Sequence, residues 1–201
     1  MKTIKAILFD IGNVILFFDN HRVSRQLSEK TGKTESKLFK LVFDLYTELE
    51  LDLGKTPPEK FLGLIQKEMD LKLDIAELKF IFSNIFQENE RVSNLIKLLK
   101  WKISILAVSN TNESHFEFIR GNFPILHWID RIIPSCEMGV KKPHPGIYFE
   151  ALKYARAKPE ECIFIDDQEK NIIPAHLLGF KTHLYKSYEG LVEFLSKLKI
   201  I

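Results

Sequence analysis

Three aspartates directly follow apolar runs that read as buried strands. Asp10 ends the run of residues 4–10, and Asp166 and Asp167 follow the apolar residues 162–165. Because parallel strands end at the same edge of a sheet, we expect these carboxylates to lie close together. At least one of three neighbouring carboxylates would stay protonated unless a cation lay among them. The natural cation is Mg²⁺, which prefers oxygen ligands and is usually held by one or two carboxylates plus a substrate phosphate.

Other polar side chains are expected at the same edge. Ser109 and Asn110 end a further apolar run. Lys142 could supply a second positive charge, because Pro143 restricts the residue before it to an extended backbone. Lys141 is the alternative inward-pointing lysine, and the proline favours Lys142 only weakly.

The elements that must position these residues alternate between strand and helix. The strongest apolar runs are continuous, which predicts strands buried on both faces of a parallel sheet. The helix-length segments between the runs are amphipathic. We predict a Rossmann-like, doubly wound α/β fold with its site beyond the carboxyl ends of the strands. The predicted strands are residues 4–10, 103–109, 130–135, 162–166 and 181–185, and the helices are residues 89–100, 146–156 and 169–179.

The segment from residue 20 to residue 88 differs from this alternation. It has the periodicity of four helices and no convincing strand. We therefore predict a helical cap domain of residues 17–89, placed over the mouth of the sheet, and an α/β domain of residues 1–16 and 90–201. Four aromatic residues in or near the cap are expected in packing, with a substrate pocket as the alternative: Phe17, Phe18, Phe43 and Tyr46.

Composition excludes several classes of partner. The chain has 201 residues, 45% of them hydrophobic, which is enough for a full core. Its formal net charge is only +2, so nucleic acid and anionic membranes are not expected partners. No apolar stretch approaches the roughly 18 residues that span a bilayer. Two cysteines are too few for a disulfide framework, so we expect a cytoplasmic protein.

The strand-end residues carry a resemblance to a known family. The stretch "FDIGNVI", the pair Ser109-Asn110, the stretch "GVKKPHPGIY" and the stretch "FIDDQEKN" resemble the four motifs of the haloacid dehalogenase-like hydrolase superfamily. They occur in the order and spacing of that family over essentially the whole chain. The helical segment lies where the family has its first-position cap. The first motif resembles a subgroup that includes sugar-phosphate phosphatases acting on glucose 1-phosphate.

The resemblance implies a role for each matching residue. Asp10 would be the nucleophile that forms an aspartyl-phosphate, and Lys142 would neutralise the charge on phosphate and nucleophile. The implied substrate-binding residues are Ser109, Asn110 and Asn13. The implied Mg²⁺ ligands are Asp10, Asp167, Asp166 and the carbonyl of Gly12.

Gly12 is a departure from the family pattern. Most phosphatases of the family have a second aspartate at this position, which protonates the leaving oxygen. Glycine cannot transfer a proton, a step usually worth about 10²–10⁴ in rate. Either the substrate has a good leaving group, such as an anomeric sugar phosphate, or a water or a cap residue such as Asp19 or His21 donates the proton.

The predicted function is therefore Mg²⁺-dependent hydrolysis of small phosphate monoesters through an aspartyl-phosphate. The predicted partner is a small phosphorylated metabolite, and the chain is expected to be a monomer or a homodimer. One alternative is a metal-independent 2-haloacid dehalogenase, which also needs no acid, although the pair Asp166-Asp167 would raise pKa values beside its nucleophile. The other is a non-catalytic binding protein on the same fold, which would not require Asp10.

Overall fold

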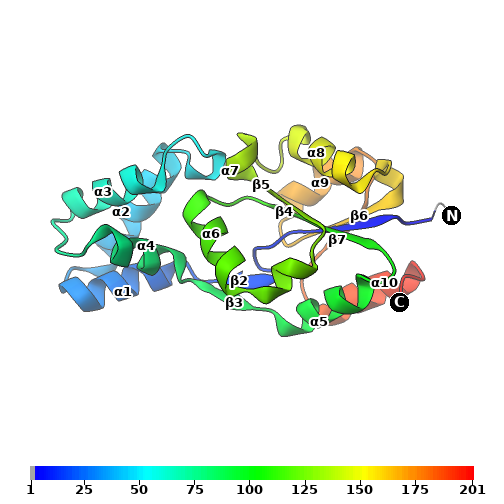
Figure 1. Cartoon of the computed structure of the whole chain (residues 1–201), viewed down its shortest axis with the longest axis horizontal. Helices are drawn as coiled ribbons and strands as arrows, with labels where there is room; N and C mark the ends of the chain where they lie inside the picture. Colours follow the sequence, from blue (N-terminus) through cyan, green and yellow to red (C-terminus); the bar gives the residue numbers. More distant parts are fainter. Residues whose placement is uncertain (1–2) are drawn as a thin grey trace.

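The centre of the molecule is a five-stranded parallel sheet (Figure 1). The computed structural model describes residues 3–201. The strands lie in the order β5-β4-β1-β6-β7, so β1 is central. Their bounds are β1 Ala6–Phe9, β4 Ser104–Ser109, β5 Arg131–Pro134, β6 Cys162–Asp166 and β7 Lys181–Leu184. This sheet confirms the predicted α/β fold.

Helices cover both faces of the sheet, which explains why its strands are continuously apolar. In β1, Ile7 and Phe9 point into a core cluster that α5 and α10 complete, whereas Ala6 and Leu8 point into a second cluster with α8 and α9. Within residues 3–201, no helix is long and apolar enough to cross a bilayer. The helices of this part are α5 Glu90–Leu99, α6 Glu113–Asn122, η2 Pro124–Trp128, α7 Ser135–Met138, α8 Pro145–Ala155, η3 Pro159–Glu161, α9 Glu169–Leu177 and α10 Tyr188–Lys197.

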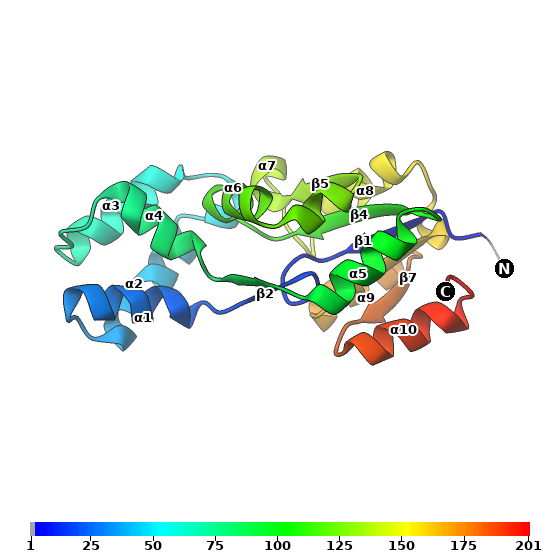
Figure 2. The same ribbon diagram turned by 60° about the horizontal axis from the view of Figure 1, so that its bottom comes forward.

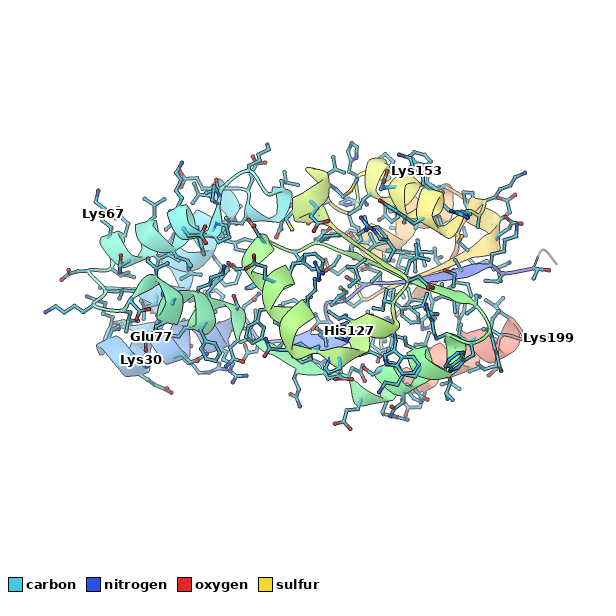
Figure 3. The ribbon with its side chains drawn as sticks, in the orientation of Figure 1. Lys30, Lys67, Glu77, His127, Lys153 and Lys199 are labelled. Carbon is cyan, nitrogen blue, oxygen red and sulfur yellow. The ribbon has the colours of Figure 1, made fainter. Side chains whose placement is uncertain are left out.

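The cap region contains four α-helices and one short 3-10 helix around a core of its own. Phe61, Leu62 and Ile65 of α3 are among the buried residues of this separate cluster. Lys30 of α1 and Glu77 of α4 form an ion pair of 2.6 Å on its surface (Figure 3). Both ribbon views place these helices beyond the carboxyl end of β1 (Figure 2). The helices are α1 His21–Thr31, α2 Glu35–Glu48, η1 Leu51–Leu53, α3 Pro58–Glu68 and α4 Ile75–Ser83.

A two-stranded ribbon connects the cap to the sheet, and the sequence did not predict it. Strand β2 (Leu16–Phe18) pairs antiparallel with β3 (Phe86–Glu88). The prediction of helices and no strand over residues 20–88 was wrong at its end, where α4 stops at Ser83 and β3 follows. Strand β3 forms by pairing with β2, which lies far away in the sequence. The strand was missed because three residues are too few to show the alternation of a strand.

The cap also contacts the α/β domain away from the ribbon, where η1 lies against α7. Gly54 has φ +65°, and a Cβ at this position would lie 2.1 Å from the backbone oxygen of Cys136. Beside this contact, Lys141 of the α/β domain forms an ion pair of 3.1 Å with Asp52 of the cap. The backbones of η1 and α7 therefore lie so close together here that only glycine fits at position 54.

Candidate active site

The three aspartates predicted to converge do so at the carboxyl ends of β1 and β6. One carboxylate oxygen from each of Asp10, Asp166 and Asp167 lies within 4.8 Å of the other two. The two strands are neighbours in register, and the backbone N–H of Asp10 donates to the Ile165 carbonyl at 2.8 Å. The parallel ladder thus brings together carboxylates that are more than 150 residues apart.

Lys142 is the lysine that enters this cluster. Its Nζ lies 2.8 Å from Asp10 Oδ1 and 2.8 Å from Asp166 Oδ2, and the residue is only 2% exposed. The third contact of Nζ is the carbonyl of Val108 on β4, at 2.8 Å. Since Lys141 points instead to the cap, the structure decides between the two candidate lysines.

Asp10 has one fixed oxygen and one free oxygen. Oδ1 accepts from the backbone N–H of Ile11 at 2.7 Å as well as from Lys142. Among the described residues, no donor contacts Oδ2. Two donors therefore fix the carboxylate while leaving one oxygen available for chemistry.

The site carries more negative than positive charge. Burial raises the pKa of Asp10 to about 7; Lys142 acts against this rise and Asp166 adds to it. Burial lowers the pKa of Lys142, but its attraction to Asp10 and Asp166 outweighs burial and raises that pKa overall. The pKa of Asp167 is also raised, mainly by burial, with its hydrogen bond to Asn13 opposing. A bound cation would favour the ionised form of each carboxylate.

Asp166 and Asp167 have different surroundings. Asp166 is fully buried, and its two oxygens accept from Lys142 Nζ, from Asn171 Nδ2 at 3.0 and 3.1 Å and from the backbone N–H of Gln168. Oδ1 of Asp167 is buried without a hydrogen-bond partner among the described residues. This orphaned oxygen belongs to a carboxylate of the three-aspartate cluster that includes Asp10, and it fits a hard divalent cation because such a cation needs oxygen ligands. Direct metal ligation by Asp166 stays a prediction.

The two predicted amides contact other site residues. Asn13, with φ +55°, donates from Nδ2 to Asp167 Oδ2 at 3.1 Å. Asn110 brackets the backbone of Lys142, accepting from its N–H at 2.8 Å and donating to its carbonyl at 2.9 Å. These contacts fix the side chain of Asp167 and the backbone of Lys142, and substrate binding by either amide stays a prediction. The Ser109 hydroxyl has no such partner among the described residues, and Ser109 lines the adjacent cavity.

A cavity of about 170 Å³ lies between this site and the cap. It reaches Gly12, Ser109 and Asn110 on the α/β side. Of the four aromatic residues named from the sequence, Phe18, Phe43 and Tyr46 line the cavity. Phe17 does not, and its side chain is 44% exposed.

The structure shows what occupies the space beside Gly12. A Cβ built on Gly12 would lie 3.0 Å from Cε1 of Phe18. An aromatic ring of the ribbon therefore crowds the place where a side chain of residue 12 would start. Sequence reasoning missed this contact because it depends on how the chain folds back from β2.

Asp19 and His21, the two cap residues considered as proton donors, are not among the cavity-lining residues. The hydrogen bond from Arg25 is the main cause that lowers the pKa of Asp19 below its ordinary value, although the side chain is exposed. His21 is exposed and stacks on Phe39, with 4.1 Å between ring centroids. Neither side chain is placed to protonate a leaving oxygen in the cavity.

Two curated proteins that resemble this chain over most of its length are phosphatases. A D-ribitol-5-phosphate phosphatase from Bacteroides thetaiotaomicron is 28% identical over 190 residues, which cover 89% of this chain and 90% of the relative. A sesquiterpene phosphatase from Aspergillus oryzae is 26% identical, covering 88% of this chain and 87% of the relative.

Solved structures show the same arrangement of elements. A haloacid dehalogenase (HAD) family enzyme from Bacteroides thetaiotaomicron superimposes with a TM-score of 0.83 at 25% identity, covering 96% of this chain and 99% of the other. The same enzyme in complex with magnesium and inorganic phosphate superimposes with a TM-score of 0.80 at 24% identity, covering 94% and 98%. The sequence profile of the haloacid dehalogenase-like hydrolases matches residues 4–179, and the chain therefore belongs to this family.

Proposed function

We propose that this hydrolase is a Mg²⁺-dependent phosphatase that acts on small phosphate monoesters through an aspartyl-phosphate. The observation that carries the proposal is Asp10, a buried carboxylate with one oxygen fixed by Lys142 and the other free, in one cluster with Asp167, whose Oδ1 has no hydrogen-bond partner among the described residues. The names of the two curated relatives, both phosphatases, support the reaction type. The complex of the related enzyme with magnesium and phosphate supports the choice of ion.

The residues that would hold Mg²⁺ are Asp10, Asp167 and the carbonyl of Gly12, with Asp166 next to them. The bound ion would supply positive charge that offsets the repulsion between a phosphate dianion and the carboxylates. Asn13 would keep Asp167 oriented through its 3.1 Å hydrogen bond. A fixed carboxylate loses less entropy when it takes a ligand.

The chain's own residues carry out the two chemical steps. Asp10 attacks phosphorus with one carboxylate oxygen, a P–O bond to the carboxylate forms, and the ester P–O bond breaks, its electron pair leaving with the alcohol oxygen. Lys142 neutralises part of the charge that builds up on the phosphoryl oxygens and stays protonated between Asp10 and Asp166. A water molecule then attacks phosphorus, which breaks the acyl phosphate bond, releases phosphate and restores Asp10.

Residues 17–89 act as a cap in this proposal, and residues 1–16 and 90–201 form the catalytic domain. Tyr46 on α2 supports this division, because its hydroxyl accepts a hydrogen bond of 3.3 Å from Asn112 across the boundary. A cap held in this way excludes water from the cavity while phosphate is transferred.

The two alternatives fit the contacts less well. A metal-free dehalogenase would gain nothing from the orphaned Asp167 oxygen, and the nearby negative charge would raise the pKa of its nucleophile. A binding protein would bury Asp10 and Lys142 without using the free oxygen. Release of chloride from 2-chloropropionate without Mg²⁺ would establish the first alternative and overturn the phosphatase.

The test is release of inorganic phosphate from acetyl phosphate, with Mg²⁺ and with EDTA. Acetyl phosphate is a small acyl phosphate with a good leaving group, so it reports phosphoryl transfer while making little demand on the cavity. We expect hydrolysis that requires Mg²⁺ and falls at least about 10³-fold in Asp10→Asn, because the nucleophile is lost. The matched control is Asp44→Asn on the exposed side of α2. Hydrolysis that survives Asp10→Asn would refute the proposal.

A further inference from the structure

The walls of the cavity next to Gly12 are mostly apolar. The ribbon and the segment before it contribute Phe18, Ile85 and Phe86, and helix α2 contributes Val42 and Phe43. The cavity is bounded by Gly12 and Ser109 at the site and by the cap opposite, which makes it the candidate space for the group that leaves from phosphorus.

Most polar groups of the walls already have partners within the protein. The Tyr46 hydroxyl donates to Asp52, and His115 Nε2 donates to the Phe82 carbonyl at 3.0 Å. Both Asn110 amide atoms are bound to the Lys142 backbone. A sugar hydroxyl buried here would lose its water and gain few hydrogen bonds, which is costly.

Charge on the walls excludes a second phosphate or carboxylate on the substrate. Across the described residues, the lining contains no lysine or arginine, and its one acidic residue is Asp52. Two polar lining side chains have no described hydrogen-bond partner, Ser109 at the site and Asn20 on the cap side, so one polar substituent could be matched at the cap end.

The size of the cavity limits the leaving group to about one ring. A volume of about 170 Å³ is close to that of an engineered 150 Å³ apolar cavity, which binds benzene. A nucleoside or a fifteen-carbon chain would need a much larger space than this.

The missing acid restricts the leaving group further. The edge of the Phe18 ring lies 3.0 Å from the place where a Cβ of residue 12 would lie, and neither Asp19 nor His21 lines the cavity. A phenol has a pKa of about 10, whereas an alkyl alcohol is closer to water at about 15.7. A phenolate can therefore leave with its charge, and an alkoxide needs a proton donor to leave at a comparable rate.

We propose that the preferred substrates are phosphate monoesters of single-ring phenols, an assignment that rests on the proposed phosphatase function. The ring lies against Phe18, Phe43 and Phe86, and the phenol oxygen points at phosphorus above Asp10. When the P–O bond breaks, the phenolate keeps the electron pair and takes a proton from water afterwards. The apolar walls and the absent acid lead independently to the same class of substrate.

The substrate test compares kcat/KM for four compounds with Mg²⁺ present. Phenyl phosphate has the ring and the good leaving group, benzyl phosphate has the ring alone, and D-glucose 1-phosphate has neither an apolar group nor a phenol. Acetyl phosphate reports the phosphatase activity itself. We expect phenyl phosphate to exceed benzyl phosphate and glucose 1-phosphate each by about 10²-fold, as for loss of acid assistance or of a matched pocket. Suppose that acetyl phosphate is hydrolysed but kcat/KM for phenyl phosphate does not exceed that for glucose 1-phosphate. This result would overturn the substrate inference and leave the proposed phosphatase function standing.

A binding measurement tests the inference even if no ester is hydrolysed. Phenol and ribitol are compared as ligands of the unmodified protein by saturation-transfer NMR. Binding of phenol but not ribitol is expected, and the absence of phenol binding would overturn the inference. Failure of acetyl phosphate hydrolysis, in contrast, would count against the proposed function.

A pair of cap variants locates the ring. Phe43→Ala removes a cavity wall, whereas Phe80→Ala removes a cap phenylalanine that is 55% exposed and does not line the cavity. We expect Phe43→Ala to lower the ratio of kcat/KM for phenyl over acetyl phosphate about tenfold, within the range for a lost apolar contact. Phe80→Ala should leave this ratio unchanged. Thermal unfolding of both variants checks folding, and equal effects on the ratio would overturn the placement.

Discussion

His115 should make the stability of the protein fall as the pH drops below about 6.5. The imidazole is buried on α6, where Nε2 donates to the Phe82 carbonyl at 3.0 Å and the ring stacks on Phe82 with 4.5 Å between centroids. Burial is the main cause that lowers its pKa from 6.5 to about 4; the hydrogen bond to Phe82 and the charge of Asp52 act weakly the other way. Protonation would therefore place a charge among the aromatic rings where the cap meets the sheet.

The size of the effect follows from the two pKa values. The unfolded chain binds a proton at His115 below pH 6.5, whereas the folded chain does so only near pH 4. Folding stability from this residue is thus complete above pH 6.5 and is lost progressively down to pH 4. At 1.36 kcal/mol for each pKa unit, the loss reaches about 3 kcal/mol, a substantial fraction of the stability of a typical domain.

The assay is urea unfolding of wild type and His115→Phe at several pH values between 7.5 and 4. Phenylalanine keeps the stacking but cannot titrate, so the wild type should lose about 3 kcal/mol relative to the variant over this range. The control is His127→Phe at an exposed position (Figure 3). It should differ from wild type by the same amount at each pH. A pH-independent difference for His115→Phe would refute the reasoning.

Three further outcomes are expected. Lys142→Met should lower the free energy of unfolding by about 3–5 kcal/mol, because it leaves two buried carboxylates without their cation. The same variant should release phosphate at least about 100-fold more slowly. Wild-type stability in this variant would contradict the ion-pair geometry. Gly54→Ala should lower the melting temperature by more than Gly32→Ala does. Both glycines have positive φ, but only at position 54 would a Cβ lie 2.1 Å from the Cys136 oxygen. Equal melting temperatures of the two variants would count against the close approach. Removal of Mg²⁺ with EDTA should abolish acetyl phosphate hydrolysis and its return should restore it; activity that persists in EDTA would exclude the metal-dependent reaction.

The sheet was predictable because each strand carries its own signal. Burial on both faces requires an unbroken apolar run, and residues 103–109 and 162–166 show one directly. Strand β3 gives no comparable signal, since Phe86 continues the apolar periodicity of α4 and becomes extended only by pairing with Phe18. Local periodicity cannot reveal a partner so distant in the sequence.

The site was predictable to the extent that it follows from strand ends. Asp10 and Asp166 end neighbouring strands, so their meeting follows from the fold alone. The contacts of Asn13 depend on a left-handed backbone, and those of Phe18 depend on the angle at which the ribbon leaves the sheet. These contacts depend on tertiary structure, so the sequence alone does not reveal them. The contact of Phe18 also contributes to the shape of this particular pocket.

The ribbon also makes the protein easy to dissect. Phe18 and Phe86 face each other directly, so a two-residue Asn-Gly turn in place of residues 19–85 would join them as a hairpin without changing the register. The shortened chain would keep every strand of the parallel sheet and lose the hydrophobic cluster around Phe61, which belongs to the cap alone. The helices between Phe18 and Phe86 could therefore be exchanged for another helical insert at the same two anchor points, while the strand order of the parallel sheet stays as it is.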